Sequence, residues 1–175
     1  MTKHRYSRFH SLIQRIASTN PGSLLLSHIL HHLDKIYLKL SNGRSTLTSI
    51  LAGVPMAILT TTGAKSGLAR TLPLVFIRDR NTPDAIALIA SNWGQRQNPG
   101  WYFNLKARPH ATCSINGQVR VYISHEASAE EYASYWQSAS ETYVGFPLYK
   151  QRAGRRHIPI MVLIPEESSP SEPVS

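Results

Sequence analysis

The sequence has a single cysteine, Cys113, among its 175 residues. A disulfide within the chain is therefore excluded, and this favours a reducing compartment. No apolar run reaches the roughly 20 residues that a membrane-spanning helix needs. The basic start at residues 1–5 is not followed by the uninterrupted apolar core of a secretory signal. We therefore expect a cytoplasmic protein.

Acidic residues are also scarce. The chain has 10 Asp and Glu against 19 Lys and Arg, and only 17% of its residues are charged. Such a basic protein attracts an anionic partner: nucleic acid, a membrane surface or a polyanionic cofactor. The zinc-finger spacings, RNA-binding strand motifs and homeodomain-like helices that would favour nucleic acid are missing. We therefore expect no nucleic-acid partner.

Motifs for catalysis by the protein's own side chains are missing as well. There is no Gly-x-Ser-x-Gly nucleophile elbow and no paired carboxylates in a motif. His28, His31 and His32 lie close in sequence, but no Cys, Glu or further His completes a metal site. A reaction here would belong to a bound cofactor, with the protein supplying binding, orientation and electrostatics.

Residues 1–53 predict an N-terminal helical segment with helices over 8–18 and 23–40. The second carries an apolar stripe at helical spacing, made of Leu26, Ile29, Leu30, Leu33, Ile36, Tyr37 and Leu40. This stripe fits packing on the core or on a partner subunit. The histidines and lysines off the stripe also fit a basic helix resting on the inner face of a membrane. Both interpretations stay open.

Residues 54–165 predict a β-rich domain, and the Glu-, Ser- and Pro-rich residues 166–175 predict a disordered tail. A short helix is expected from Asn98 as N-cap and Pro99 to Ala107. A capping box at Ser128 predicts a helix to about Tyr143, where Gly145 and Pro147 break it. The expected strands cover 54–61, 70–78, 85–91, 111–115, 118–124 and 158–164. Six short strands with few helices between them suggest a small antiparallel barrel.

The most informative stretch, from Gly63 to Arg70, lies between the first two expected strands. Two glycines with Lys65, Ser66 and Arg70 around them suggest a tight turn whose N–H groups and cations face an anion. Lys65 would act as a point charge and Arg70 as a fork for phosphate or carboxylate. A solvated hairpin is the alternative. The spacing does not match a phosphate-binding Walker A loop, and a strand rather than a helix follows.

A wider set of ordered motifs resembles the deazaflavin-dependent nitroreductase family, whose members are reductases that use coenzyme F420. The motifs are Leu59-Thr60-Thr61-Thr62-Gly63-x-Lys65-Ser66-Gly67-x-x-Arg70-Thr71-x-Pro73, Ala90-Ser91-Asn92, Asn98-Pro99-x-Trp101-Tyr102-x-Asn104-Leu105 and Ile158-Pro159-Ile160-Met161-Val162-Leu163-Ile164-Pro165. The resemblance covers residues 54–165. It implies an α+β protein, mainly β, with the split β-barrel of the FMN-binding type.

The resemblance also implies hydride transfer from reduced F420 to an activated acceptor such as a quinone or a nitro compound. Proton donation is expected from Tyr143, Tyr149 or Ser91. The implied cofactor-binding residues are Ala64, Lys65, Ser66, Arg70, Thr71, Leu72, Pro73, Leu74, Val75, Ile89, Ala90, Ser91, Asn92, Gly100, Trp101, Tyr102, Phe103, Asn104 and Phe146.

Some positions depart from the family's pattern. Phe146 stands where a Tyr is known, Asn92 where a Lys is common, Ala64 where an Arg is common and Val75 where a Tyr can occur. These departures bear on nitroimidazole-type activity rather than on the cofactor. Two alternatives stay open: a split-barrel protein that uses FMN or binds haem or another tetrapyrrole, and a non-enzymatic membrane-associated protein. A homodimer is also open, because related split barrels are often dimers.

Overall fold

A computed structural model describes residues 54–79, 82 and 84–166 of the chain. The helices expected over 8–18 and 23–40 lie outside the described residues, and so does the tail expected over 166–175 apart from its first residue. No helix in the described part is long and apolar enough to cross a membrane.

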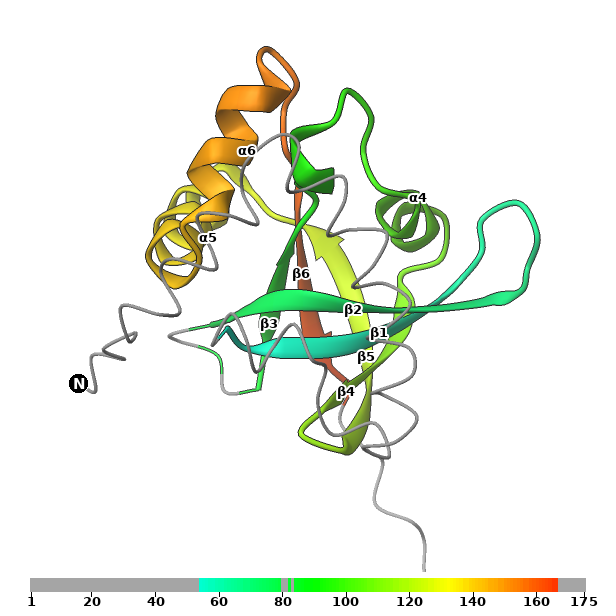
Figure 1. Ribbon diagram of the computed structural model, residues 1–175. Coiled ribbons are helices and arrows are strands. Elements are labelled where there is room, and N and C mark those ends of the chain that lie inside the picture. Colours follow the sequence, from blue (N-terminus) through cyan, green and yellow to red (C-terminus); the bar gives the residue numbers. More distant parts are fainter. Residues whose placement is uncertain (1–53, 80–81, 83, 167–175) are drawn as a thin grey trace, which may run out of the picture.

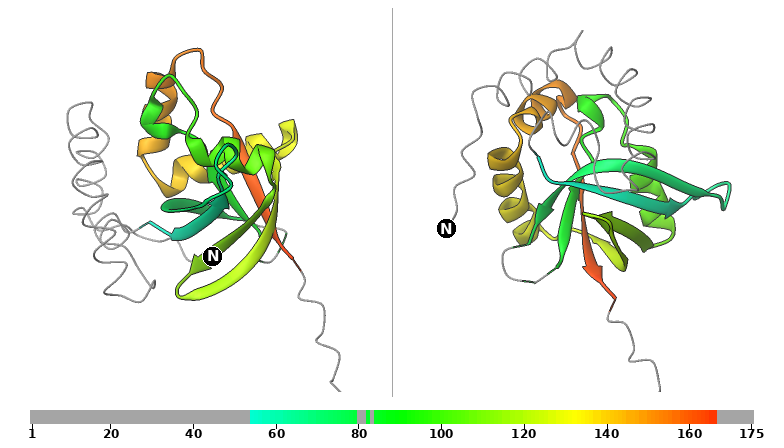
Figure 2. Two further views of the ribbon diagram at one scale, coloured as in Figure 1. Left: turned by 90° about the vertical axis from the view of Figure 1, so that its right-hand side faces the viewer. Right: turned by 60° about the horizontal axis from the view of Figure 1, so that its bottom comes forward.

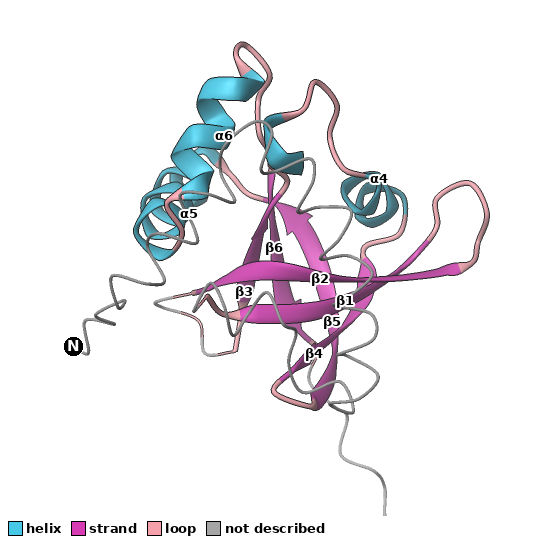
Figure 3. Cartoon of the chain, viewed as in Figure 1, coloured by secondary structure: helices cyan, strands magenta, loops and turns pink. Residues whose placement is uncertain are grey.

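Six antiparallel strands form a closed barrel in the order β1-β2-β3-β6-β5-β4, with β4 pairing back to β1. In the part of the chain that the structure describes, three α-helices and one 3-10 turn accompany the barrel (Figures 1 and 3). The expected barrel is therefore confirmed. The elements are β1 (Met56–Thr62), β2 (Ala69–Arg78), β3 (Ile86–Ile89), η1 (Asn92–Gly94), α4 (Gly100–Ala107), β4 (His110–Ile115), β5 (Gln118–Glu126), α5 (Ala129–Thr142), α6 (Gly145–Ala153) and β6 (Ile160–Pro165).

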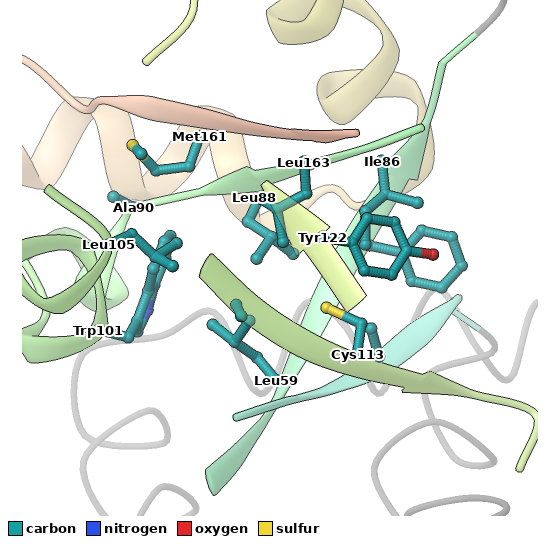
Figure 4. Packing of buried hydrophobic residues seen from close by; sticks show 13 residues of the cluster. Leu59, Ile86, Leu88, Ala90, Trp101, Leu105, Cys113, Tyr122, Met161 and Leu163 are labelled. Carbon is teal, nitrogen blue, oxygen red and sulfur yellow. The ribbon is translucent and has the colours of Figure 1, made fainter. Parts of the chain in front are cut away.

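Two strands, β3 and β6, are apolar on both faces. Ile86 and Leu88 of β3 belong to the cluster inside the barrel, together with Trp101, Cys113 and Tyr122 (Figure 4). The alternate residues Ala87 and Ile89 belong to a second cluster, which includes residues of α5 and α6. This explains the continuously apolar sequence of β3, which has the barrel interior on one side and helices on the other.

One edge of β2 is only partly paired. Ala69–Val75 pair with β1, but β3 pairs only with residues 76–78. Among the described strands, the second backbone edge of residues 69–75 therefore has no partner. Pro73, which has no N–H to donate, lies in this segment, as expected of a proline in a strand.

The region after α5 differs from the prediction. The capping box is present, since the Ser128 side chain accepts from the Glu131 N–H and the Glu131 carboxylate accepts from the Ser128 N–H. The chain does not stay irregular after Gly145, however, because residues 145–153 form α6. Pro147 is tolerated because it lies in the first turn, where a backbone N–H has no partner within the helix.

The start of α4 also needs a correction. Asn98 was expected as the N-cap, with Pro99 as the first helical residue. In the structure Pro99 is the N-cap, with extended backbone, and the helix begins at Gly100. The Asn98 side chain accepts a hydrogen bond from Arg156 instead. This tertiary contact replaces the local cap.

Candidate active site

The β1–β2 connection is a closed turn that extends away from the barrel body (Figure 2). The Gly63 N–H donates to the Leu68 carbonyl at 2.8 Å, and the Gly67 N–H donates to the Gly63 carbonyl at 2.8 Å. Gly67 has a φ of 68°, which a glycine adopts at little cost. We call residues 63–68 the glycine loop.

Helix α4 and the residue after it hold the base of the glycine loop. The Asn104 side chain accepts from the Ala64 N–H at 2.9 Å and donates to the Thr61 hydroxyl at 3.0 Å. Arg108 donates to the Gly63 carbonyl at 2.9 Å. The loop is therefore anchored at its base although its outer residues are exposed.

Lys65 and Arg70 are exposed, and neither forms an ion pair with a carboxylate among the described residues. Ser66 lies between them and its hydroxyl accepts from the Leu68 N–H at 3.3 Å. Lys65 on the anchored turn and Arg70 at the start of β2, with no carboxylate partner in the described part of the chain, form a surface suited to phosphate or carboxylate.

The predicted cofactor-binding residues 71–75 lie on the part of β2 that pairs only with β1 among the described strands. The Thr71 hydroxyl contacts the Thr60 hydroxyl at 2.9 Å. Leu72 and Leu74 pack against the cluster inside the barrel, and Val75 packs against the outer cluster. These side chains contact the barrel, and the edge of this segment that no described strand pairs with carries backbone N–H and C=O groups.

A sharp turn follows β3. Asn92, Trp93 and Gly94 have φ values of 46°, 58° and 77°, a left-handed conformation that costs energy for the two non-glycine residues. Ser91 is buried, and its carbonyl accepts from the Gly94 N–H at 2.9 Å. We call residues 90–94 the strained turn; it contains three of the predicted cofactor-binding residues.

Arg156 joins the strained turn to the segment before α4. Its guanidinium donates to the Ser91 carbonyl at 2.6 Å, to the Ala90 carbonyl at 3.3 Å and to the Asn98 side chain. Its Nε is buried without a hydrogen-bond partner. Burial lowers the pKa of Arg156 from its usual value.

The predicted residues on α4 have different environments. Trp101 is buried inside the barrel, and Phe103 is 51% exposed. The Tyr102 hydroxyl donates to Glu126 at 3.1 Å, and Lys106 donates to the same carboxylate oxygen at 2.9 Å. Burial raises the pKa of Tyr102, with a further contribution from its hydrogen bond to Glu126.

The predicted aromatic residues form a buried cluster on the outside of the barrel. The hydroxyls of Tyr143 and Tyr149 are 3.0 Å apart, and the ring of Phe146 makes edge contacts with both tyrosines. This cluster meets the strained turn through the rings of Trp93 and Tyr149, whose centroids are 5.7 Å apart. The tyrosines and Ser91, predicted as proton donors, therefore lie in one connected region of the fold.

Three residues important to this geometry were not singled out in the sequence. They are Trp93, Arg108 and Arg156. Arg108 and Arg156 occur in polar stretches that also fit solvated loops, and only their positions in the fold reveal the carbonyls that they bind. Among the described residues there is no group of three or more His, Cys, Asp or Glu that could hold a metal ion.

These features define a small antiparallel barrel with an anchored cationic turn and a strained turn, which suit an anionic cofactor bound beside β2. The chain belongs to the F420H(2)-dependent quinone reductase family, whose model matches residues 33–165. It is 34% identical over 134 residues to the F420H(2)-dependent quinone reductase Rv1261c of Mycobacterium tuberculosis, covering 74% of this chain and 85% of that protein.

Solved structures agree with this assignment. The F420-H2 dependent reductase FDR-A has a TM-score of 0.56 and 32% identity, covering 63% of this chain and 94% of its own. A structure described as a domain-swapped dimer has a TM-score of 0.59 and 27% identity, covering 83% and 100%. The heme storage protein HutZ from Vibrio cholerae, at 10% identity and a TM-score of 0.50 over 78% and 92%, shares the fold alone.

Family membership confirms the predicted enzyme class and cofactor: the chain is an F420H2-dependent oxidoreductase.

Proposed function

We propose that this enzyme reduces a quinone with F420H2, and that the glycine loop holds the anionic part of the cofactor. The observation that carries the proposal is the pair of exposed cations, Lys65 on the glycine loop that Asn104 and Arg108 anchor and Arg70 at the start of β2 beside it. When bound, the reduced deazaflavin supplies a hydride to the acceptor. Backbone groups of β2 and residues of the strained turn would hold the ring.

Fluorescence titration with oxidised F420 tests this assignment. We expect Lys65→Ala and Arg70→Ala to weaken cofactor binding by about tenfold or more each, because each removes a charge-assisted contact to an anion. Arg155→Ala removes an exposed cation elsewhere on the surface and is the matched control. Unchanged affinity in both loop variants, with the control also unchanged, would make the glycine loop an ordinary hairpin. A parallel titration with FMN tests the alternative cofactor.

The two-electron reduction of a quinone needs a proton as well as a hydride. We assign proton donation to the region of Tyr143, Tyr149 and Ser91. The contact between the two tyrosine hydroxyls supports this assignment, because a proton can pass between groups 3.0 Å apart. Tyr143→Phe and Tyr149→Phe should lower kcat with a quinone while leaving F420 affinity unchanged. A kcat equal to wild type in both variants would remove the tyrosines from the reaction.

A homodimer is supported by the related structure described as a domain-swapped dimer. The outer face of β5 also exposes Val119, Val121 and Ile123. Sedimentation velocity of the wild type and Val121→Glu tests this arrangement. A dimer that the substitution dissociates supports the β5 face, and a wild-type monomer at micromolar concentration contradicts it.

A cytoplasmic location, with residues 1–53 meeting the inner face of a membrane, is a further part of the proposal. It rests on the amphipathic pattern of residues 23–40. Liposome sedimentation with and without residues 1–45 tests it, and equal sedimentation of the two forms would contradict it.

A further inference from the structure

The strained turn needs support from outside itself. Two consecutive non-glycine residues with positive φ persist only where surrounding contacts hold them. Three local hydrogen bonds hold it: the Asn92 side chain donates to the Gln97 carbonyl at 2.8 Å, the Gly94 N–H to the Ser91 carbonyl and the Gln95 N–H to the Asn92 carbonyl. All three stay within residues 91–97, so none of them fixes the turn relative to α4.

Arg156 connects the strained turn to the segment before α4. It comes from the segment between α6 and β6, more than fifty residues along the chain from either partner segment. Its two terminal nitrogens donate to the carbonyls of Ala90 and Ser91 in the strained turn and to the Asn98 side chain before α4. A planar fork with fixed donor directions therefore sets both the separation and the relative orientation of the two segments.

The contacts of Arg156 do not resemble those of an anion-binding arginine. Both terminal nitrogens already donate to protein oxygens, and Nε, which has no hydrogen-bond partner, is buried. Lys65 and Arg70, in contrast, are exposed and have no carboxylate partner in the described part of the chain. The two kinds of cation therefore have separate roles: the glycine loop presents charge to a ligand, and Arg156 organises the wall beside it.

We infer that Arg156 is a positioning residue that holds the strained turn at a fixed place relative to the start of α4 and thereby orients the bound ring for hydride transfer. This inference rests on the proposed function. It predicts that losing the fork misaligns the ring more than it weakens binding, because the anionic part of the cofactor is held at the glycine loop. Small misplacements of reacting groups lower rates by up to about a hundredfold.

The test compares Arg156→Lys, Asn98→Ala and the control Arg155→Lys. Arg156→Lys keeps the positive charge but loses the fork, and Asn98→Ala removes one acceptor while Arg156 stays in place. We expect kcat with F420H2 and a quinone to fall about 10- to 100-fold in Arg156→Lys and less in Asn98→Ala. The dissociation constant for oxidised F420 should stay within about threefold of wild type, since the glycine loop is unchanged.

A second measurement uses the cofactor-free protein. Hydrogen exchange should be faster in Arg156→Lys at the amides of Gly94 and Gln95, which donate within the strained turn. Exchange at Gly63 and Gly67 should not change, and Arg155→Lys should match wild type throughout. A purely stabilising role for Arg156 would lower the melting temperature and leave kcat of the folded enzyme unchanged.

Each outcome decides between the alternatives. A wild-type kcat in Arg156→Lys, or unchanged exchange at residues 94 and 95, overturns the positioning role. A loss of F420 affinity as large as that of Lys65→Ala also overturns it, because Arg156 would then bind the cofactor directly. Failure of the wild type to bind F420 overturns the proposed function instead, and the exchange measurement still shows whether Arg156 holds the turn.

Discussion

The side chain of Asn104 links the glycine loop to the barrel. Its amide accepts from the Ala64 N–H and donates to the Thr61 hydroxyl, so it uses both of its polar ends on the base of the glycine loop. The sequence motif predicted Asn104 as a cofactor-binding residue. The structure gives it an anchoring contact at the base of the loop, and we propose that it acts on the cofactor through the loop.

Asn104→Ala should therefore lower both stability and affinity. We expect a loss of about 1–3 kcal/mol in the free energy of unfolding, because the Ala64 N–H and the Thr61 hydroxyl lose their partner. F420 affinity should fall as the loop loosens. Urea denaturation and F420 titration measure the two effects. Full stability with wild-type affinity would show that Arg108 alone anchors the loop.

At Gly145 the absence of a Cβ atom is needed for packing against a neighbouring side chain. A Cβ added there would collide with the aromatic ring of Tyr143, which is buried and cannot swing away. Gly145→Ala should therefore lower the melting temperature by several degrees, as expected for about 1–3 kcal/mol of overpacking in a domain of this size. Gly100→Ala meets nothing within 4 Å and is the control. Equal melting temperatures for the two variants would contradict this packing.

Local signals in the sequence predicted some residues better than others. The Asn116-Gly117 turn, which joins the strands expected over 111–115 and 118–124 and is a dipeptide favoured in hairpins, and the Ser128 capping box depend on neighbours in sequence, and both form in the structure. The roles of Asn98 and Arg156 depend on a contact between residues 58 positions apart. No local pattern encodes such a contact, so Asn98 was misread as a helix cap.

At the scale of elements, α5 depends on its capping box. The Glu131 carboxylate accepts from the Ser128 N–H at 2.8 Å, and this hydrogen bond is the largest cause of the lowered pKa of Glu131. A carboxylate whose pKa is lower in the folded state stabilises the fold above its unfolded pKa. That contribution is lost as the pH falls through the folded value.

We therefore expect the free energy of unfolding to decline below about pH 4.5, and Glu131→Gln to flatten part of that decline. Ser128→Ala should cost about 1 kcal/mol at neutral pH, as typical for loss of an N-cap. Urea denaturation between pH 3 and pH 7 measures both effects. The capping contribution would be refuted by identical pH profiles for wild type and Glu131→Gln.

Helix α6 shows why one element was missed. The sequence contains Gly145 and Pro147, which are typical of a helix end, and the prediction stopped α5 there. The same residues begin a new helix in the structure. Gly145 is required by the Tyr143 ring, and Pro147 falls in a first turn. Glycine and proline occur both at the end of one helix and at the start of the next, so the sequence alone does not distinguish the two cases.

At the scale of the whole molecule, the barrel encloses its single cysteine. Cys113 is 1% exposed, and burial raises the pKa of its thiol to about 12. We expect alkylation by iodoacetamide at pH 8 to be slow in the folded protein and fast in urea, because the reactive thiolate is scarce and shielded. Mass spectrometry over time measures the two rates. Rapid modification without denaturant would mean that the barrel opens readily.

The shared strands β3 and β6 also limit how the molecule can come apart. Their residues alternate between the cluster inside the barrel and the cluster under the helices, so both hydrophobic clusters contain residues of the same two strands. Releasing the helices would expose one face of both strands to water, and opening the barrel would remove the surface on which the helices pack. We therefore expect the glycine loop, the strained turn and the aromatic cluster to unfold together, as one cooperative unit. Thermal unfolding should show one transition, without an intermediate in which the barrel is folded and the helices are unfolded.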